Sequence, residues 1–383
     1  MKILQIHNEY FVKGGEEVVI ETEKKFLVKN GHKVDQLIRK NKNEIQSILD
    51  WFYVLNNLSN SKKSTQILDE YFKKNKYPDI VHIHNLFPLW SFSVIEFFKK
   101  KEIPIIITLH NYRFLWDKIK LLDKNSFKYG FFKNSKILTL IIGYLFNKNN
   151  KFFKYVSNFI CLTKFQKNLF KNFGFNKKHL IVKQNSLKLT NKYIEWKNRN
   201  EKIIYVGRLS PEKGVYTILK AWKIWGKNAP ILEIVGNGEE EEKLKKYKKE
   251  HGLTKVIFSG KLTYKQVQKK IEKSKLLIIP SEWYEPFGLV ILEAFSKGTP
   301  VAASNIGSLP NLVKNNHNGF LFKFKNEISL FKKVKQAWTK KNYLKNFSKK
   351  TKNTFNQFYK INNNYQILIS IYKKAIKNNK ILT

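Results

Sequence analysis

The chain has one cysteine, few acidic residues and no apolar run long enough to cross a bilayer. Cys161 lies inside the apolar run FICLT and has no second cysteine to pair with, which excludes an internal disulfide. The apolar stretch 136–146 is well short of the about 20 residues that a spanning helix needs. The sequence opens on a core-like strand instead of a signal peptide. These features predict a cytoplasmic protein.

Motifs of several functional classes are also missing. Zinc motifs, RNP-like strands and helix-turn-helix signatures do not occur, and no repeat has a solenoid period. The paired glycines near the N-terminus lack the G-x-G-x-x-G spacing of nicotinamide and flavin enzymes. There is no convincing D-x-D metal motif, so we expect neither a metal ion nor another cofactor.

Basic residues greatly outnumber acidic ones. The chain has 73 Lys and Arg against 29 Asp and Glu, a formal net charge of +44. Abundant Lys, Asn, Ile and Phe are typical of an AT-rich genome, and in that interpretation the lysines only solvate the surface. A field of this sign also attracts polyanions. A basic nucleic-acid-binding protein is therefore an alternative from another class. The charge is spread along the whole chain instead of forming one stripe, which disfavours a specific nucleic-acid partner.

One segment of the N-terminal half indicates binding to a membrane surface. KILTLIIGYLF at 136–146 is followed by the basic and aromatic KNNKFFKY at 148–155. This pattern predicts an amphipathic helix lying in the surface of an anionic membrane. A helix buried in the N-terminal domain is the alternative.

Strand and helix patterns alternate along the chain, which predicts an α/β protein. At 383 residues, 42% of them hydrophobic, the chain suits two domains with ample core. The first unit is a strand at 1–10, a helix at 16–29 and a strand at 32–38. Gly14 and Gly15, between the first strand and the helix, allow a ligand to approach the backbone closely. A plain strand–helix turn is the alternative.

Two further apolar strands, at 79–85 and 103–113, each end in a polar cluster. The ends of parallel strands carry the sites of open α/β sheets, and His110 should emerge at such an end. His82 and His84 alternate with apolar residues, and packing is the favoured role for His82. A zinc site of these three histidines is disfavoured, because no cysteine or carboxylate cluster completes the set.

The most informative segment reads PSEWYEPFGLVILEAFSKGTPVAAS, following a strand at 276–279. We expect Glu285 to cap a helix with Pro286 at its first position. The free amides of Phe287, Gly288 and Leu289 would then form an anion site. On one helix, Glu285 and Glu293 would lie about 80° apart around the axis and roughly 12 Å apart along it. They would hold two different sugars at the two ends of a diphosphate, as in a sugar nucleotide.

A second motif, YVGRLSPEKGV at 205–215, follows a strand at 203–206. Ser210 is expected to cap a new helix, with Pro211 at its first position and Lys213 in its first turn. Arg208 and Lys213 can then converge on a diphosphate at the helix N-terminus. Lysine is common in this chain and arginine is rare, so Arg208 is the more informative of the two.

Together these motifs resemble a retaining glycosyltransferase of family 4, with the GT-B fold. GRLSPEKGV, VGNGEEEEKL at 235–244, EPFGLVILEAFSKGTPV and NIGSLPNLV occur in the family's order and spacing, and the resemblance covers nearly the whole chain. It implies that the donor diphosphate is held by Arg208, Lys213, Gly14, Gly15, Gly236 and the amides of Phe287, Gly288 and Leu289. It further implies that Glu285 binds the transferred sugar, Glu293 binds the ribose and His110 lies beside the donor sugar.

The sequence departs from the family pattern in three places. Gln184, Asn185 and Ser186 stand where relatives usually have an Asn-Gly turn, and Asn311 stands where a glutamate is common. The region 116–134, which usually helps to shape the acceptor site, is shortened. These departures leave the acceptor and the contacts of the hinge loop open.

The resemblance implies two Rossmann-like lobes facing each other across a cleft. The acceptor lobe would comprise 1–187 and the donor lobe 200–355, with a helical segment at 356–383 crossing back. The expected reaction moves a sugar from a nucleoside diphosphate sugar to a hydroxyl with retained configuration. The expected acceptor is lipid-linked or a saccharide, in polysaccharide, capsule or lipopolysaccharide synthesis on the inner face of the membrane. A sugar-nucleotide epimerase and a non-catalytic binding relative are alternatives within the same fold.

Overall fold

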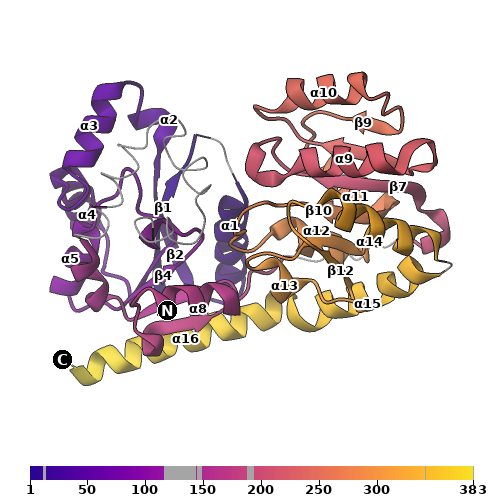
Figure 1. Ribbon diagram of the computed structural model, residues 1–383. Coiled ribbons are helices and arrows are strands. Elements are labelled where there is room, and N and C mark those ends of the chain that lie inside the picture. The colour runs from indigo at the N-terminus through magenta and orange to yellow at the C-terminus, as the bar shows by residue number, and fades with distance from the viewer. Residues whose placement is uncertain (12–13, 116–143, 145–148, 188–193, 341, 383) are drawn as a thin grey trace. The chain divides into compact units, whose positions relative to one another are not determined.

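We describe the protein from a computed structural model (Figure 1). It describes all residues except 12–13, 116–143, 145–148, 188–193, 341 and 383. The segments predicted at 116–134 and 136–146 therefore lie outside the described residues, apart from Tyr144. The chain divides into two compact units, residues 1–185 with 361–383, and residues 186–360.

The N-terminal unit is built on a six-stranded parallel sheet in the order β2-β1-β3-β4-β5-β6. Parallel strands require crossover connections, and helices supply them. Its strands are β1 Lys2–Glu9, β2 Lys33–Lys40, β3 Ile80–Ile83, β4 Ile105–Thr108, β5 Asn158–Cys161 and β6 Leu180–Val182. Its helices are α1 Gly15–Lys29, α2 Asn41–Glu44, α3 Ile48–Asn56, α4 Lys62–Lys74, α5 Ser93–Lys100, α8 Lys164–Asn172 and α16 Ile361–Leu382, with short 3₁₀ turns at Arg113–Leu115, Asn149–Tyr155 and Lys177–His179.

One face of this sheet is closed by the first and the last helix of the chain. Leu27 of α1 and Leu368 and Tyr372 of α16 pack in one buried cluster with isoleucines of β1, β3, β4 and β5. On the other side, α3, α4 and α5 follow one another along the unit (Figure 1). Residues from the end of the chain therefore complete the core that the first strands begin.

The second unit repeats the architecture with the order β12-β11-β10-β7-β8-β9, again all parallel. Its core joins the sheet to α9, α14 and α15 through apolar side chains such as Ile218, Trp222, Val334 and Phe347. Its strands are β7 Asn200–Val206, β8 Ile231–Val235, β9 Val256–Phe258, β10 Ser274–Ile279, β11 Val301–Ser304 and β12 Gly319–Phe322. Its helices are α9 Val215–Trp225, α10 Glu241–Glu250, α11 Tyr264–Lys273, α12 Leu289–Ser296, α13 Leu309–Leu312, α14 Glu327–Thr339 and α15 Tyr343–Phe358, with 3₁₀ turns at Trp196–Asn198, Pro211–Lys213 and Gly226–Asn228.

The two parallel sheets confirm the predicted α/β fold of two Rossmann-like units. The helix expected at 16–29 is α1, which begins one residue earlier, and the expected first, second and third strands are β1, β2 and β3. The final helix, α16, begins at Ile361 and belongs to the N-terminal unit, whereas α15 ends the second unit. Across the described residues, no helix is both long and apolar enough to span a membrane.

Candidate functional site

The loops after β7 and β8 in the second unit pack backbone against backbone. The amide of Gly207 donates to the carbonyl of Val235 at 3.0 Å, and the amide of Leu209 donates to the carbonyl of Asn237 at 2.9 Å. Gly236 has a φ of 139°, and a Cβ there would lie 1.9 Å from the carbonyl oxygen of Gly207. Only glycine fits this position. The loop after β7, which carries Arg208, is therefore shaped by its contact with the loop after β8.

A second close approach brings the β7 loop onto the loop after β10. Gly214 has a φ of 66°, and a Cβ there would lie 2.1 Å from the carbonyl oxygen of Pro280. β7 and β10 are adjacent parallel strands, so their C-terminal ends meet at the same edge of the sheet. Lys213 precedes this contact, and its ammonium group forms an ion pair with the Glu285 carboxylate.

The Glu285 carboxylate is buried, with 8% of the residue exposed. Its Oε1 also accepts a hydrogen bond of 2.8 Å from the Ser281 hydroxyl. Burial opposes ionisation, but the Lys213 ammonium and these hydrogen bonds outweigh it, and the pKa of Glu285 lies below its ordinary value. Glu285 is therefore an anion at neutral pH, held beside a cation.

Arg208 differs from the other three arginines of the chain. Arg39 and Arg199 are buried and hydrogen-bonded to other residues, and Arg113 lies over the Tyr10 ring at 4.5 Å. The side chain of Arg208 is 61% exposed, and its partner is Glu212 at 3.4 Å. In a chain that otherwise uses lysine as its surface cation, this is the arginine positioned to meet a ligand.

The start of α12 corrects the expected cap. The helix begins at Leu289, and its N-cap is Gly288 in the left-handed conformation, with a φ of 90°. Glu285 and Pro286 precede the helix, so neither caps it nor opens it. Glu285 and Glu293 therefore do not lie on one helix, contrary to the prediction. The first amides of α12, including that of Leu289, have no intrahelical acceptor. The amides of Phe287 and Gly288 belong to the preceding loop.

The loop after β7 also differs from its expected form. Ser210 precedes a 3₁₀ turn, Pro211–Lys213, with the proline at its first position as predicted. Its hydroxyl donates to Glu212 at 2.6 Å instead of capping the backbone. Gly214 then separates this turn from α9, so Lys213 lies before the α-helix and not in its first turn.

Glu293 lies in the second turn of α12, on the side of α11. Burial raises the pKa of Glu293 to about 7, an effect that Gln268 of α11 reduces. Burial raises the pKa of Tyr264, also on α11, to about 12, with a further contribution from the Glu293 carboxylate. Glu293 is thus a carboxyl group poised to ionise near neutral pH, which suits a partner that donates hydrogen bonds.

In the N-terminal unit, the loop before α1 carries the two glycines. The amide of Gly14 donates to the Glu17 carboxylate at 2.7 Å, and Glu17 lies 3.6 Å from His7. A Cβ at Gly14 would make only ordinary contacts, and its φ is −122°. A side chain would therefore fit at position 14, which is the N-cap of α1, where glycine is among the favoured residues. Gly15 is the first residue of α1.

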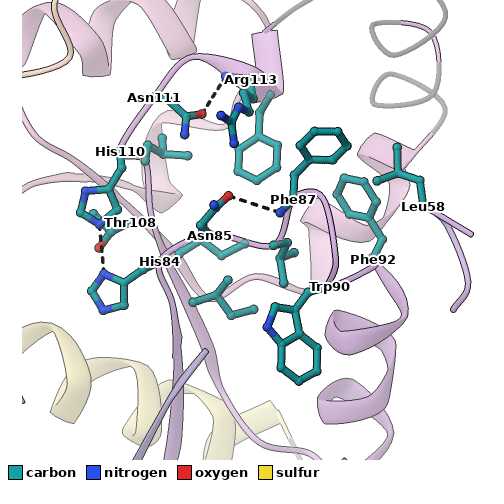
Figure 2. Close-up of a pocket in the computed structure, with 15 residues that line it drawn as sticks. Leu58, His84, Asn85, Phe87, Trp90, Phe92, Thr108, His110, Asn111 and Arg113 are labelled. Carbon is teal, nitrogen blue, oxygen red and sulfur yellow. Dashed lines mark hydrogen bonds between the residues drawn. The ribbon is translucent and has the colours of Figure 1, made fainter. Parts of the chain in front are cut away.

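His110 follows the end of β4, as the sequence predicts, and joins a row of histidines (Figure 2). Its Nε2 lies 3.0 Å from Nδ1 of His84. Burial, with contributions from His7, His82 and Lys183, holds the pKa of His110 well below its ordinary value. Its imidazole is therefore neutral at physiological pH. His110 and His84 line a small cavity, about 20 Å³, with Asn85, Phe87, Trp90 and Arg113.

His82 has the packing role that the sequence favoured. It is fully buried, and its two ring nitrogens lie 2.6 Å from the Tyr372 hydroxyl and 2.7 Å from the Thr108 hydroxyl. Burial lowers its pKa to about 4. The ring thus ties β3 to β4 and to α16.

Sequence reasoning missed the buried ion pair beneath these histidines. Lys183 donates to Glu23 of α1 at 2.5 Å, and both side chains are buried. Glu23, His82 and His84 offer three ligand atoms within 4.8 Å of one another, the arrangement of a candidate metal cluster. Lys183 already occupies Glu23, and both nitrogens of His82 have hydroxyl partners, so these residues do not fit a metal ion. No local signal in the sequence connects Glu23 to Lys183, which is 160 residues away.

Sequence models of two families match consecutive halves of the chain. Residues 13–189 match the model described as Glycosyltransferase Family 4, and residues 190–354 match Glycosyl transferases group 1. The boundary between the two models lies near the division between the two compact units.

Each of the curated relatives matches less than half of the chain. An uncharacterised glycosyltransferase of Methanocaldococcus jannaschii is 32% identical over 46% of this chain and 45% of its own length. A glycogen synthase of Mycobacterium tuberculosis is 36% identical over 30% of this chain and 29% of its own. The alignments thus span less than half of the length of these two relatives.

Solved structures match nearly the whole chain at low identity and so show the fold. A sucrose-phosphate synthase of Thermosynechococcus elongatus has a TM-score of 0.78 at 16% identity, covering 98% of this chain and 99% of that one. The Anabaena HepE protein in complex with UDP has a TM-score of 0.71 at 17% identity, covering 98% and 100%. With both family models and both sheets in agreement, the chain belongs to the glycosyltransferases of the GT-B fold.

Proposed function

We propose that the protein transfers a sugar from a nucleoside diphosphate sugar to a hydroxyl acceptor. The observation that carries this proposal is the cluster of Arg208, Lys213 and Glu285 at one edge of the second sheet. It places the Lys213 ammonium against one buried carboxylate, with the exposed Arg208 in the same loop as Lys213. The two cations can bind the anionic diphosphate of a sugar nucleotide. The carboxylate can accept hydrogen bonds from the hydroxyls of its sugar. HepE, whose structures contain UDP and UDP-glucose, shares the fold and so supports a sugar-nucleotide donor.

In the proposed reaction the diphosphate leaves as the bond to the anomeric carbon breaks. Arg208 and Lys213 stabilise the negative charge that develops on the leaving oxygen, together with the first amides of α12. Lys213 exchanges part of its contact with Glu285 for the phosphate, while Glu285 accepts hydrogen bonds from the sugar. Retention of configuration follows if the leaving phosphate takes the acceptor proton on the same face.

His110 would contribute a neutral imidazole. Its Nε2 is engaged with His84, so Nδ1 is the nitrogen available to a sugar hydroxyl. An imidazole kept neutral by burial can donate or accept one hydrogen bond without adding a second charge near the donor. The function of His110 is thus orientation of the sugar and not proton transfer.

In other transferases a divalent ion stabilises the charge on the leaving diphosphate. Arg208 and Lys213 can do so here, and we therefore propose that the enzyme is metal-independent. The acceptor would be a lipid-linked or saccharide precursor of a surface polysaccharide, on the cytoplasmic face of the membrane. The net charge of +44 favours an anionic lipid surface.

A panel of sugar nucleotides tests the proposal. Purified protein is incubated with each donor, with and without a chelator, and release of the nucleoside diphosphate is measured. We expect turnover of one donor, unchanged by the chelator. Binding without turnover of any donor would indicate a non-catalytic relative, and strict dependence on Mg²⁺ or Mn²⁺ would overturn the metal-independent mechanism.

A further inference from the structure

Helix α3 of the N-terminal unit is attached to its unit by one apolar face. Val54 is 7% exposed, and Leu58, just beyond the helix, is 3% exposed. The ring of Trp51 lies 6.4 Å from that of Phe87. These positions recur three and four residues apart, as expected for the buried stripe of a surface helix.

The opposite face of α3 is also apolar, and it is exposed. Leu49 is 73% exposed, Phe52 is 56% exposed and Tyr53 is 50% exposed. Leu49 has the largest exposed fraction among the exposed large hydrophobic side chains that the structure describes. The three positions again have a spacing of three and four residues, so they form one patch, which we call the α3 outer face. Packing requires only one apolar face, and a second one indicates a contact outside the unit.

Basic residues flank α3 in the sequence on both sides. Residues 39–63 contain five Lys and Arg and two Asp and Glu, a net charge of +3. Both acidic groups are engaged locally: Glu44 pairs with Arg39 and Lys63, and Asp50 accepts from the amides of Gln46 and Ser47 in the helix cap. Lys40, Lys42 and Lys62 are exposed at the two ends of the segment.

We propose that the α3 outer face inserts into the headgroup region of an anionic lipid bilayer. The apolar side chains can enter the acyl region of a bilayer, and the exposed lysines can bind its anionic headgroups. A second copy of the chain fits less well, because it would bring the same positive charge to a protein that already carries +44. Nine residues are about 14 Å of helix, so α3 lies in the interface and does not span it.

This inference rests on the proposed function only where the acceptor is lipid-linked. α3, which follows α2 and precedes α4 along one side of the N-terminal unit, would then hold the enzyme at the surface that contains its acceptor (Figure 1). α3, at Ile48–Asn56, is a separate segment of the chain from the one expected at 136–155.

Vesicle flotation tests the surface. The full-length protein is mixed with vesicles of phosphatidylglycerol and phosphatidylcholine, and the bound fraction is measured against lipid concentration. Leu49→Ser with Phe52→Ser should weaken binding at least about tenfold, since each removes an apolar group from the interface. Ile328→Ser, at a residue 53% exposed on α14, is the matched control and should leave binding unchanged. High salt should weaken binding without abolishing it.

A second measurement detects insertion of α3 directly, without relying on the double serine variant, which could misfold, or on enzyme activity. Leu49→Cys is labelled with an environment-sensitive fluorophore. Cys161 stays unlabelled because it is buried and burial raises the pKa of its thiol to about 12. A blue shift on anionic but not on neutral vesicles supports insertion, and turnover of a soluble donor should be unaffected in the double serine variant. Unchanged vesicle binding of that variant, absence of the shift, or dimerisation by light scattering that the serines abolish, would overturn the proposal.

Discussion

Lys213 and Glu285 form an ion pair although 72 residues separate them along the chain. They lie in the loops after β7 and β10, which are neighbours in the second sheet and run parallel. Two loops with opposite charges thus meet at one edge of the sheet. The pair satisfies a buried carboxylate before a donor binds, and it keeps Lys213 close to the position where a diphosphate would lie.

Arg208 should matter for catalysis more than for folding. Arg208→Ala removes an exposed, forked donor, and we expect transfer to slow by about 10²- to 10³-fold with little change in thermal stability. Arg208→Lys should recover part of the rate. Lys223→Ala, at an exposed lysine of α9, is the control for lost surface charge and should have almost no effect. Equal rates for the alanine variant and the wild type would remove Arg208 from the site.

Glu285→Gln and Glu293→Gln should distinguish contacts to the transferred sugar from contacts to the nucleotide. The first should lower the rate of transfer strongly while free nucleoside diphosphate still binds, because Glu285 is assigned to the transferred sugar. The second should weaken the nucleotide itself, because Glu293 is assigned to the ribose. Calorimetry with the free diphosphate measures both affinities. An equal loss in both variants would mean that the two assignments are wrong.

The pKa of Glu293 predicts a pH dependence of stability. Because its pKa is raised from 4.5 to about 7, the folded state holds the proton more tightly than the unfolded chain. Its stabilising contribution is complete below pH 4.5 and is lost as the pH rises through about 7. Between pH 5 and 8, wild-type stability should therefore fall relative to Glu293→Gln, by about 3 kcal/mol at most. Urea unfolding of both proteins at each pH measures this difference, and parallel curves would contradict it.

Two glycines offer a matched test of loop packing. Gly236→Ala places a Cβ 1.9 Å from a backbone oxygen, and we expect it to lower the free energy of unfolding by about 3 kcal/mol or more. Gly252 has a φ of 60° and nothing within 4 Å of its Cβ position, so Gly252→Ala should cost only about 1 kcal/mol. Thermal unfolding of both variants distinguishes steric overlap from backbone strain. Similar losses would mean that the β7 and β8 loops readily separate.

Several features of the site could be predicted because their causes are local. A short apolar run that ends in a polar cluster predicts β4 and the emergence of His110 at its end. The rarity of arginine marked Arg208, whose side chain is exposed as a ligand contact requires. These patterns depend on residues a few positions apart, where strand and helix periodicities are visible in the sequence.

The beginning of α12 shows where local rules fail. Glu285 and Pro286 have the residue types of a cap and a first helical position, yet the helix begins at Leu289. Glu285 is instead held in the loop by Lys213 and Ser281. A buried ion pair outweighs a cap worth about 1 kcal/mol, and the partner that supplies it lies in the loop after β7.

The sequence by itself determined the alternation of strands and helices, the two-unit organisation and the motifs that carry the charges and glycines of the candidate donor site. Only the tertiary structure decided that Glu23 pairs with Lys183 and that α3 has a second, exposed apolar face. The physical reason is that periodicity is a property of neighbouring residues. Burial and charge pairing instead depend on residues that only the packing of sheets and helices brings together.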